Sequence, residues 1–433
     1  MSREDMLHER LRAGSSASFG DLSPSSSYFA ARSLSVQSSR ASSPAIPNLP
    51  SISCVYQLRQ DRLVLDLSVP EEDAKAGICP LAWSGGNIIL FSRGNRIHFR
   101  NMSLNEDVGQ LTKIRSSHGN LRAIECGEKD NYPHSISVLT SKGHIQLFDL
   151  STKTMVTSWQ TKGATSMKWN GPVLTVAEKR GTIRHFDTRL PSGSKEHMKK
   201  VTRHQAEITC LAWHPDGKFL ASGDQSGLSH CWDTRKPGVP LDVGEMIQRR
   251  KKMQHDGPVT ALTWCPWSDK LLASGDCAED NTGTIRFWDV KDSTSNSNMI
   301  RNIPLDASIT SLQFSEHSKE ILSTHGVGKY TPGTVQHIYN AEQDRLIPTD
   351  PEPVPSDIQH SVVVHYYPTL YKILTRKAAK TQIASSAVSP NGQRIVLGIP
   401  EEGKLKIWDV WSKPKSSTYH QMSGLALSAP MIR

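Results

Sequence analysis

Two sets of side chains have the residue types of a hydrolase triad. The sets share one order along the chain, namely His204, Ser222, Asp224 and Trp232, and then His255, Ser274, Asp276 and Trp288. Histidine, serine and aspartate together could activate a hydroxyl as a nucleophile. A set that recurs in successive segments is instead typical of buried polar groups that satisfy each other's hydrogen bonds. We therefore predict that these residues stabilise the structure and that the chain has no catalytic residues.

No other pattern in the chain indicates an active site or a bound metal. The sequence contains no G-x-S-x-G, H-E-x-x-H or phosphate-binding P-loop pattern. His360 and His365 are five residues apart in a strand-like segment, so their side chains should point to opposite faces and not share a metal ion. We predict that the protein is not an enzyme and needs no cofactor and no metal.

The elements that must position the two sets are short strands. Between Gln254 and Val290, an alternating segment (Val259 to Trp264) is followed by an apolar run (Leu271 to Ser274) and a third strand (Thr284 to Trp288). Strands of this length, separated by turn residues, do not bury both faces alone. The unit therefore needs copies of itself beside it.

The number of copies follows from the residue that occupies the Trp position in the third strand of each repeat. The chain offers Phe99, Phe148, Phe186, Trp232, Trp288 and Trp408. The first four intervals are 49, 38, 46 and 56 residues, near the period of about 40–45 residues of WD repeats. The last interval, 120 residues, hides a further repeat with strands at 308–315, 320–326 and 361–367 and with His365 at the Trp position. The sequence predicts an all-β fold, a seven-bladed WD-repeat β-propeller.

The composition of the remaining segments indicates where the propeller begins and ends. Residues 1–50 are rich in Ser and Pro and are expected to form a disordered tail. Residues 51–76 should be a linker with a strand that pairs with the last blade and closes the ring, because closure removes exposed sheet edges. We place the propeller at 77–412, with an exposed loop inserted in blade six at 333–359, and a flexible C-terminal tail at 413–433.

Charge and cysteine usage narrow the functional class. The net charge of +9 permits acidic partners, but the only dense basic run, residues 249–252, is expected to be a solvated loop between blades, and we predict no nucleic-acid binding. No apolar stretch is long enough to span a bilayer, and the N-terminus lacks the apolar region of a secretory signal. The seven cysteines form no C-x-x-C pair, and we expect buried, reduced thiols in an intracellular protein that does not bind membranes.

Several stretches resemble one family. Ala261 to Trp267 (ALTWCPW) resembles the AVAWCPW segment of the Fizzy and Fizzy-related family, the WD-repeat coactivators of the anaphase-promoting complex. Further stretches agree with other blades of that family: CPLAWSGGN (79–87), SMKWNGPV (166–173), CLAWHPDGKFLAS (210–222), EILSTHG (320–326) and VHYYPTLYKIL (364–374). The resemblance covers residues 77–412, in register for all seven blades, and the chain is identified as a diverged member.

The resemblance implies recruitment in place of chemistry. The propeller would bind degron peptides of cell-cycle proteins, and the tails would bind the ubiquitin ligase. In this family a terminal Ile-Arg docks into a groove of a tetratricopeptide subunit of the ligase, and here Ile432 and Arg433 stand at the end of the sequence. The resemblance also implies a location in the nucleus and cytoplasm.

The chain departs from the family at its ligase and degron contacts. Members carry an N-terminal motif, D-R-[FY]-I-P-x-R, and residues 1–76 contain none; DRLIPTD (344–350) matches part of it, which we interpret as coincidence. The family's groove between the first and last blades uses an Asp before the first-blade Trp, where this chain has Ala82 before Trp83. Glu401 or Glu402 would then supply the acidic partner for a degron arginine.

The site for the Lys-Glu-Asn degron is also altered. By register, the family's Asn residues in blade four become Gln225 and Gly227, and its Arg in blade seven becomes Gln382. A specialised coactivator, for example one restricted to meiosis, fits these departures better than a general one. The alternative is a WD-repeat interaction scaffold that no longer activates the ligase.

Overall fold

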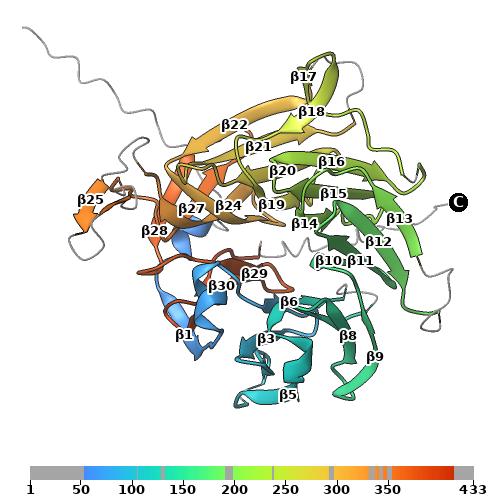
Figure 1. Cartoon of the computed structure of the whole chain (residues 1–433). Helices are drawn as coiled ribbons and strands as arrows, with labels where there is room; N and C mark the ends of the chain where they lie inside the picture. Colours follow the sequence, from blue (N-terminus) through green and yellow to red (C-terminus); the bar gives the residue numbers. More distant parts are fainter. Residues whose placement is uncertain are drawn as a thin grey trace, which may run out of the picture. The chain divides into compact units, whose positions relative to one another are not determined.

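The computed structural model describes residues 53–413, with gaps at 105, 128–131, 191–197, 237, 292–296, 331–336, 341–344 and 349–353 (Figure 1). The predicted N-terminal tail and nearly all of the predicted C-terminal tail lie outside this part of the chain. Three short helices precede or join the strands: η1 (Cys54–Tyr56), α1 (Glu71–Lys75) and η2 (Ser116–His118).

Seven antiparallel sheets, each built on a run of four strands, form the blades. Blade one contains β2 (Leu81–Trp83), β3 (Ile88–Arg93), β4 (Arg96–Asn101) and β5 (Gly109–Lys113). Blade two contains β6 (Leu121–Cys126), β7 (Ser135–Thr140), β8 (His144–Asp149) and β9 (Thr154–Gln160). Blade three contains β10 (Ala164–Asn170), β11 (Val173–Glu178), β12 (Thr182–Asp187) and β13 (Met198–Thr202). Blades four and five contain β14 (Ile208–Trp213), β15 (Phe219–Asp224), β16 (Leu228–Asp233), β17 (Glu245–Ile247) and β18 (Arg250–Gln254); and β19 (Val259–Trp264), β20 (Leu271–Asp276), β21 (Gly283–Asp289) and β22 (Met299–Leu305). Blades six and seven contain β23 (Ala307–Phe314), β24 (Glu320–Gly328), β27 (Ser361–Tyr366) and β28 (Lys372–Lys377); and β29 (Ser385–Val388), β30 (Arg394–Ile399), β31 (Lys404–Asp409) and β1 (Asp61–Asp66).

The innermost strands close into a ring. Strands β2, β6, β10, β14, β19, β23 and β29 contact one another in this cyclic order, and β29 contacts β2 again. The prediction of a seven-bladed propeller is confirmed. The outer strand of blade seven is β1, which pairs antiparallel with β31, with Leu65 opposite Leu405. One blade is thus assembled from both ends of the described chain, which fastens the ring.

The cores lie between neighbouring blades. The second strand of each blade is covered on both faces, and β15 and β20 are buried at every position. Because side chains alternate along a strand, one set packs against the preceding blade and the other against the following blade. Trp83, for example, packs in the cluster shared with blade seven, and its neighbour Ala82 packs in the cluster shared with blade two.

Two expectations about loops differ from the structure. The basic run at 249–252 is not a solvated loop between blades, because residues 250–252 begin β18, which pairs with β17 in blade four. The insertion in blade six contains a two-stranded ribbon, β25 (His337–Asn340) and β26 (Arg345–Pro348), where a loop was expected. Short inserted ribbons have too few residues for a clear alternating pattern, so their sequences resemble polar loops.

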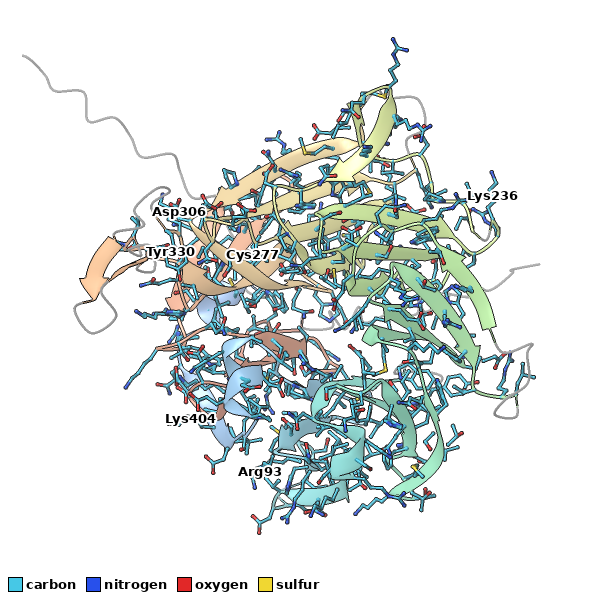
Figure 2. The ribbon with its side chains drawn as sticks, in the orientation of Figure 1. Arg93, Lys236, Cys277, Asp306, Tyr330 and Lys404 are labelled. Atoms are coloured by element: carbon cyan, nitrogen blue, oxygen red, sulfur yellow. The ribbon has the colours of Figure 1, made fainter. Side chains whose placement is uncertain are left out.

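None of the seven cysteines forms a disulfide. Cys54, Cys231 and Cys265 are buried, and the other four, including Cys277 after β20 (Figure 2), are half-buried. Burial raises the pKa of the Cys79 thiol to about 12, so this thiol stays protonated at neutral pH. Within the described residues, no helix has the length and apolar character needed to cross a membrane.

Candidate functional site

The triad-like residues of blade four form one buried network. His204 lies in the connection before β14, Ser222 and Asp224 belong to β15, and Trp232 belongs to β16. The Nδ1 atom of His204 is 2.6 Å from Asp224, its Nε2 atom is 2.7 Å from the Ser222 hydroxyl, and the Trp232 indole N–H donates to that hydroxyl at 2.8 Å. Burial opposes ionisation of Asp224, but the hydrogen bonds from His204 and Ser226 outweigh it and hold the pKa of Asp224 below its usual value.

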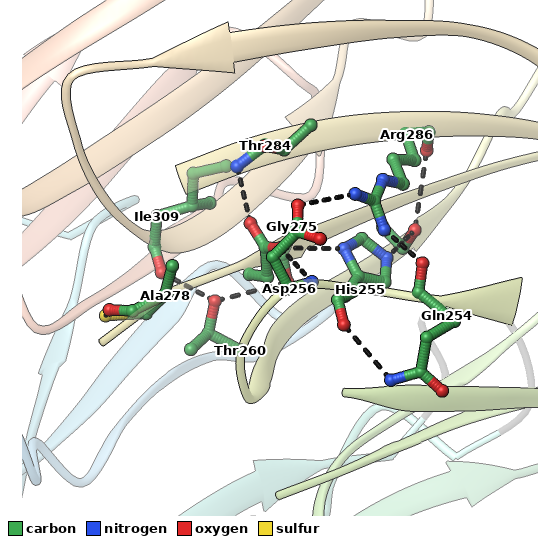
Figure 3. Close-up of polar contacts among 12 residues, drawn as sticks. Gln254, His255, Asp256, Thr260, Gly275, Ala278, Thr284, Arg286 and Ile309 are labelled. Atoms are coloured by element: carbon green, nitrogen blue, oxygen red, sulfur yellow. Dashed lines mark hydrogen bonds and ion pairs between the residues drawn. The ribbon is translucent and has the colours of Figure 1, made fainter. Parts of the chain in front are cut away.

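Blade five repeats the arrangement, and Figure 3 shows His255 among its polar contacts. The Nε2 atom of His255 is 2.7 Å from the Ser274 hydroxyl, the Trp288 indole N–H donates to the same hydroxyl at 2.7 Å, and Nδ1 of His255 is 3.2 Å from Asp276. Burial lowers the pKa of His255 although Asp276 opposes that shift, so the imidazole is neutral at neutral pH. Ser222 and Ser274 are completely buried and accept an indole N–H, and neither hydroxyl can meet a substrate. The networks hold strands together and provide no route to catalysis.

Blades six and seven alter the same positions. In blade six, Ser323 remains, but His325 replaces the Asp and His365 replaces the Trp, as the strand register shows. The Ser323 hydroxyl is 2.9 Å from Nε2 of His325. In blade seven, Trp408 is buried, and its indole N–H has no hydrogen-bond partner among the described residues. Sheet pairing and apolar packing hold these two blades without the full network.

The predicted groove residues Ala82 and Trp83 border a cavity of about 440 Å³ among the inner strands. Strands of blades one, two, three, six and seven line it, and an ion pair crosses it between Lys168 and Glu125, with 2.6 Å between Nζ and Oε1. The Trp83 indole N–H donates to Asn87 at 3.0 Å within its own blade. The Ala82 side chain is buried toward blade two, so it does not face the junction of blades one and seven where the family's Asp was expected to act.

A second cavity of about 300 Å³ lies between blades three and four and has a largely apolar lining that includes Trp213 and Leu220. It contains none of the residues that were predicted to contact degrons. Such concave apolar surfaces are common binding sites. The sequence offered no motif for it, because its lining comes from two repeats whose residues are ordinary blade positions.

The two candidate acidic residues differ in their availability. Glu402 accepts the backbone N–H of Lys380 at 2.5 Å and pairs with Lys406 at 3.1 Å. Burial opposes its ionisation, but these two partners outweigh it and hold the pKa of Glu402 below its usual value. Glu401 is exposed, and within the described part of the chain it accepts one hydrogen bond, from the Gln382 amide at 3.2 Å. Glu401 is therefore the carboxylate that remains accessible to a ligand.

The altered positions of the second degron site have local roles. The Gln382 amide donates to the carbonyls of Ala74 and Lys75, each at 3.2 Å, and so ties the connection between β28 and β29 to α1. Gly227 has a φ of +83°, and a Cβ atom there would lie 2.7 Å from the carbonyl oxygen of His255. No larger residue fits at this turn without strain. Gln225, two residues earlier, is exposed.

The predicted ligase-binding tail and both ends of the DRLIPTD segment lie outside the described residues. Ile432 and Arg433 lie outside the described residues, as do Asp344 and the last two residues of the DRLIPTD segment. The middle of that segment, Arg345–Pro348, forms β26. The ligase contact of Ile432 and Arg433 therefore remains a prediction from the sequence.

A buried carboxylate that the sequence did not indicate joins both ends of the described chain. Glu320, the first residue of β24, has no exposed surface. It accepts a hydrogen bond from the Ser53 hydroxyl, one from the Cys54 backbone N–H at 3.1 Å, and one from the Trp411 indole N–H at 2.7 Å. Burial, with the neighbouring Glu320 charge, raises the pKa of the Cys54 thiol. The only available signal was an acidic residue at a position where blades four and five have Phe219 and Leu271.

No group of three or more His, Cys, Asp or Glu residues in the described part of the chain is arranged to hold a metal ion. His365 is buried, whereas His360 lies just before β27 with a φ of +56°.

Comparison with known proteins shows which proteins this chain is similar to. The family described as "WD domain, G-beta repeat" matches residues 195–233 and 248–289, which are the regions of blades four and five. Protein FIZZY-RELATED 3 of Arabidopsis thaliana is 25% identical over 374 residues, covering 86% of this chain and 66% of that protein. The WD repeat-containing protein slp1 of Schizosaccharomyces pombe is 25% identical and covers 76% of this chain and 58% of its own length.

A further relative and a solved structure are also similar to this chain. The anaphase-promoting complex subunit cdc20 of Dictyostelium discoideum is 24% identical over 82% of this chain and 61% of its own length. A chain in a crystal structure of a mitotic checkpoint complex has the same fold, with a TM-score of 0.64, 24% identity, and coverage of 82% of this chain and 95% of that chain. The chain thus spans about two thirds or less of the length of these curated relatives. With its seven blades and the Cys265-Pro266-Trp267 segment in blade five, the chain is similar to the Fizzy-related, slp1 and cdc20 WD-repeat proteins over 76% to 86% of its length.

Proposed function

We propose that this chain is a substrate-recruiting activator subunit of the anaphase-promoting complex ubiquitin ligase and acts in cell-cycle control, with a specialised role such as meiosis. The observation that carries the proposal is similarity to Fizzy-related and cdc20 proteins over most of the described propeller. A relative from Arabidopsis thaliana is named as a cofactor of the APC complex and is 22% identical over 78% of this chain. The working locations would be the nucleus and cytoplasm.

The activity would be recruitment. The propeller would hold a degron peptide of a cell-cycle protein while the tails hold the ligase, so that two modest contacts combine through effective concentration. Transfer of ubiquitin would belong to the ligase and its conjugating enzyme. The burial of Ser222 and Ser274 within structural networks supports a role without catalysis by this chain.

Ile432 and Arg433 would supply one ligase contact. The guanidinium of Arg433 could form a two-pronged hydrogen bond with a carboxylate, and Ile432 could fill an apolar pocket of a tetratricopeptide subunit. On the propeller, Glu401 would meet a basic degron residue near blade seven, because Glu402 is committed to Lys380 and Lys406.

Affinity purification of the full chain tests the proposal. Subunits of the anaphase-promoting complex should co-purify with it, and removal of Ile432 and Arg433 should reduce their recovery strongly. A matched control replaces Ser428 and Ala429 with Gly, which keeps the last two residues and the length of the tail. Equal recovery with and without Ile432 and Arg433 would count against the tail contact, and absence of every ligase subunit would refute the proposed function. Imaging of a fluorescent fusion would test the proposed locations.

A scaffold that no longer activates the ligase is the second candidate. Three observations favour it: Ala82 faces blade two, Gly227 carries no side chain, and the Gln382 amide is already bonded to the carbonyls beside α1. Loss of a charged partner at a desolvated peptide contact weakens binding by about 2–5 kcal/mol. Ubiquitination of a co-purifying protein that depends on both the ligase and this chain would exclude the scaffold.

A further inference from the structure

An inserted ribbon interrupts the outer strand of blade four. Pro240 pairs with Trp232, and the backbone N–H of Leu241 donates to Cys231, so the chain first follows β16 as an outer strand should. It then leaves the sheet, forms the antiparallel pair of β17 and the start of β18, and returns to pair Met253 with Ser229. This ribbon (residues 245–252) accounts for the long interval between Trp232 and Trp288.

The root of the ribbon requires a glycine. Gly244 has a φ of +136°, and a Cβ atom there would lie 2.2 Å from the backbone carbon of Lys252. The two chain segments therefore approach closely where the ribbon begins. Its outer edge is open in the described structure, because β17 is the last strand of the sheet (Figure 1).

The ribbon carries four consecutive basic residues without an acidic partner. Arg249 is at the tip and is exposed, as is Arg250, and Lys251 and Lys252 follow along β18. No ion pair joins any of the four to a carboxylate of the described chain, although Glu245 is opposite Lys252 in the register. Some exposed cations elsewhere on the propeller are paired, as Lys270 is with Asp289 at 2.8 Å, so the ribbon is distinguished by its run of four charges.

The backbone of the turn and the charges beside it both destabilise the free ribbon. Gln248 and Arg249 both have positive φ values, +49° and +66°, in a two-residue turn that favours Asn and Gly. Like charges on adjacent positions repel each other. Met246, which is opposite Lys251 on the same face, is 53% exposed. An anionic partner would reduce the repulsion among the basic side chains, and one that also covered Met246 would remove this apolar side chain from water. Such a partner would therefore stabilise the ribbon.

We propose that the ribbon at 245–252 is a docking arm for an acidic, extended segment of a partner protein. Because alternate residues point to opposite faces, Arg250 and Lys252 line one face and Lys251 the other, and Arg249 lies at the tip. Lys251 shares its face with Met246, and Arg249 and Arg250 lie at or beside the tip. An acidic segment that crosses the tip can therefore meet these three charges while one apolar side chain covers Met246. The ribbon contains no aromatic residue for base stacking, and its basic surface is confined to four residues, so protein carboxylates fit it better than a nucleic acid.

Binding of a labelled peptide to the full chain tests this proposal. The probe is a fluorescein-labelled dodecapeptide of alternating Glu and Ser with one central Leu, and its counterpart has Gln in place of Glu. Fluorescence anisotropy at about 50 mM and about 300 mM salt separates charge-dependent binding from other binding. We expect the acidic probe to bind more tightly than its counterpart, and salt to weaken only the acidic probe.

Variants locate the contact. Arg250→Gln with Lys251→Gln should reduce affinity for the acidic probe by about tenfold. Gln248→Asn with Arg249→Gly builds a favourable turn, keeps the ribbon and removes one charge, so it should reduce affinity by about threefold. The matched control, Arg96→Gln with Lys113→Gln, removes two exposed charges that are opposite each other on blade one and should leave affinity unchanged. Thermal unfolding followed by circular dichroism checks that each variant is folded.

Three results would overturn the proposal. The first is unchanged affinity in the Arg250 and Lys251 variant, and the second is an equal loss in the blade-one variant. The third is tighter binding of duplex DNA than of the acidic peptide, with the same dependence on Arg250 and Lys251, which would make the ribbon a nucleic-acid contact.

Discussion

Blades four and five differ from blade six at equivalent positions of the same sheet. All three keep a buried serine, namely Ser222, Ser274 and Ser323. Blades four and five add an aspartate and a tryptophan, whereas blade six has His325 and His365 in their places. The family description matches the regions of blades four and five and not that of blade six. The sheet itself is nevertheless complete in blade six, because strand pairing and apolar contacts build it.

The difference shows what the aspartate does locally. In blade four, Asp224 also accepts the backbone N–H groups of Ser226 and Leu228, at 2.9 and 3.0 Å, and so closes the tight turn between β15 and β16. In blade six the equivalent turn is opened by the insertion that contains β25 and β26. A carboxylate at this position fixes a short turn, and its replacement by histidine accompanies a long one.

The largest expected effect is loss of Asp224. Asp224→Ala should lower the free energy of unfolding by about 3–5 kcal/mol, because it leaves His204 and two backbone N–H groups buried without their acceptor. Urea denaturation of the full chain, followed by tryptophan fluorescence, measures the loss. Asp269→Ala removes an exposed carboxylate paired with Lys291 and should leave the free energy of unfolding nearly unchanged. Equal losses in the two variants would remove the distinction between networked and surface carboxylates.

Two buried histidines of blade six should make the protein sensitive to acid. Burial lowers the pKa of His325 and His365 to about 4 each. The unfolded chain has the ordinary histidine pKa of about 6.5, so as the pH falls from 6.5 to 4 it binds protons before the folded chain does. The free energy of unfolding should keep its full value above pH 6.5 and fall by a few kcal/mol as the pH drops toward 4.

A variant assigns the acid sensitivity. His365→Phe installs the aromatic type found at the equivalent position of blades one to three and removes one buried imidazole, so it should flatten the decline of unfolding free energy between pH 6.5 and 4. Denaturation series at several pH values measure the slope. An unchanged slope would show that His365 is not a source of the acid sensitivity.

The smallest expected difference concerns the shared serine. Ser274→Ala should cost about 1–3 kcal/mol, because both His255 and the Trp288 indole N–H lose their partner. Ser323→Ala should cost about 1 kcal/mol, because only the His325 contact is close. Parallel denaturation curves compare the two. If Ser323→Ala were the more damaging, the serine would matter more in blade six than its contacts indicate.

The sequence predicted the architecture because its signals repeat. Alternating strands and the Trp-position residues indicated seven blades, and His365 marked the sixth, which has no Trp at this position, correctly. Position 82 was harder to interpret. The residue before a strand Trp necessarily faces the other blade, so Ala82 packs against blade two while Trp83 packs toward blade seven.

Features without a repeat were missed. The contact between Ser53 and Glu320 joins residues 267 positions apart, and no local pattern indicates such a pair. The ribbon at 245–252 was interpreted as a loop because a run of basic residues lacks apolar alternation. Its glycine root at Gly244 and its two-residue turn are defined only by backbone geometry. Long-range polar contacts and short inserted ribbons therefore required the structure.

Glu320 also has a consequence for the order of the blades. Since one carboxylate binds both Ser53 and Trp411, a short linker could join these residues directly, and the chain could be opened instead at a surface turn such as that around Gly392. Such a circular permutant would keep every strand pair, including β1 with β31. Which blade is numbered first then depends only on where the polypeptide is cut, and the ring of contacts is the same from any starting point.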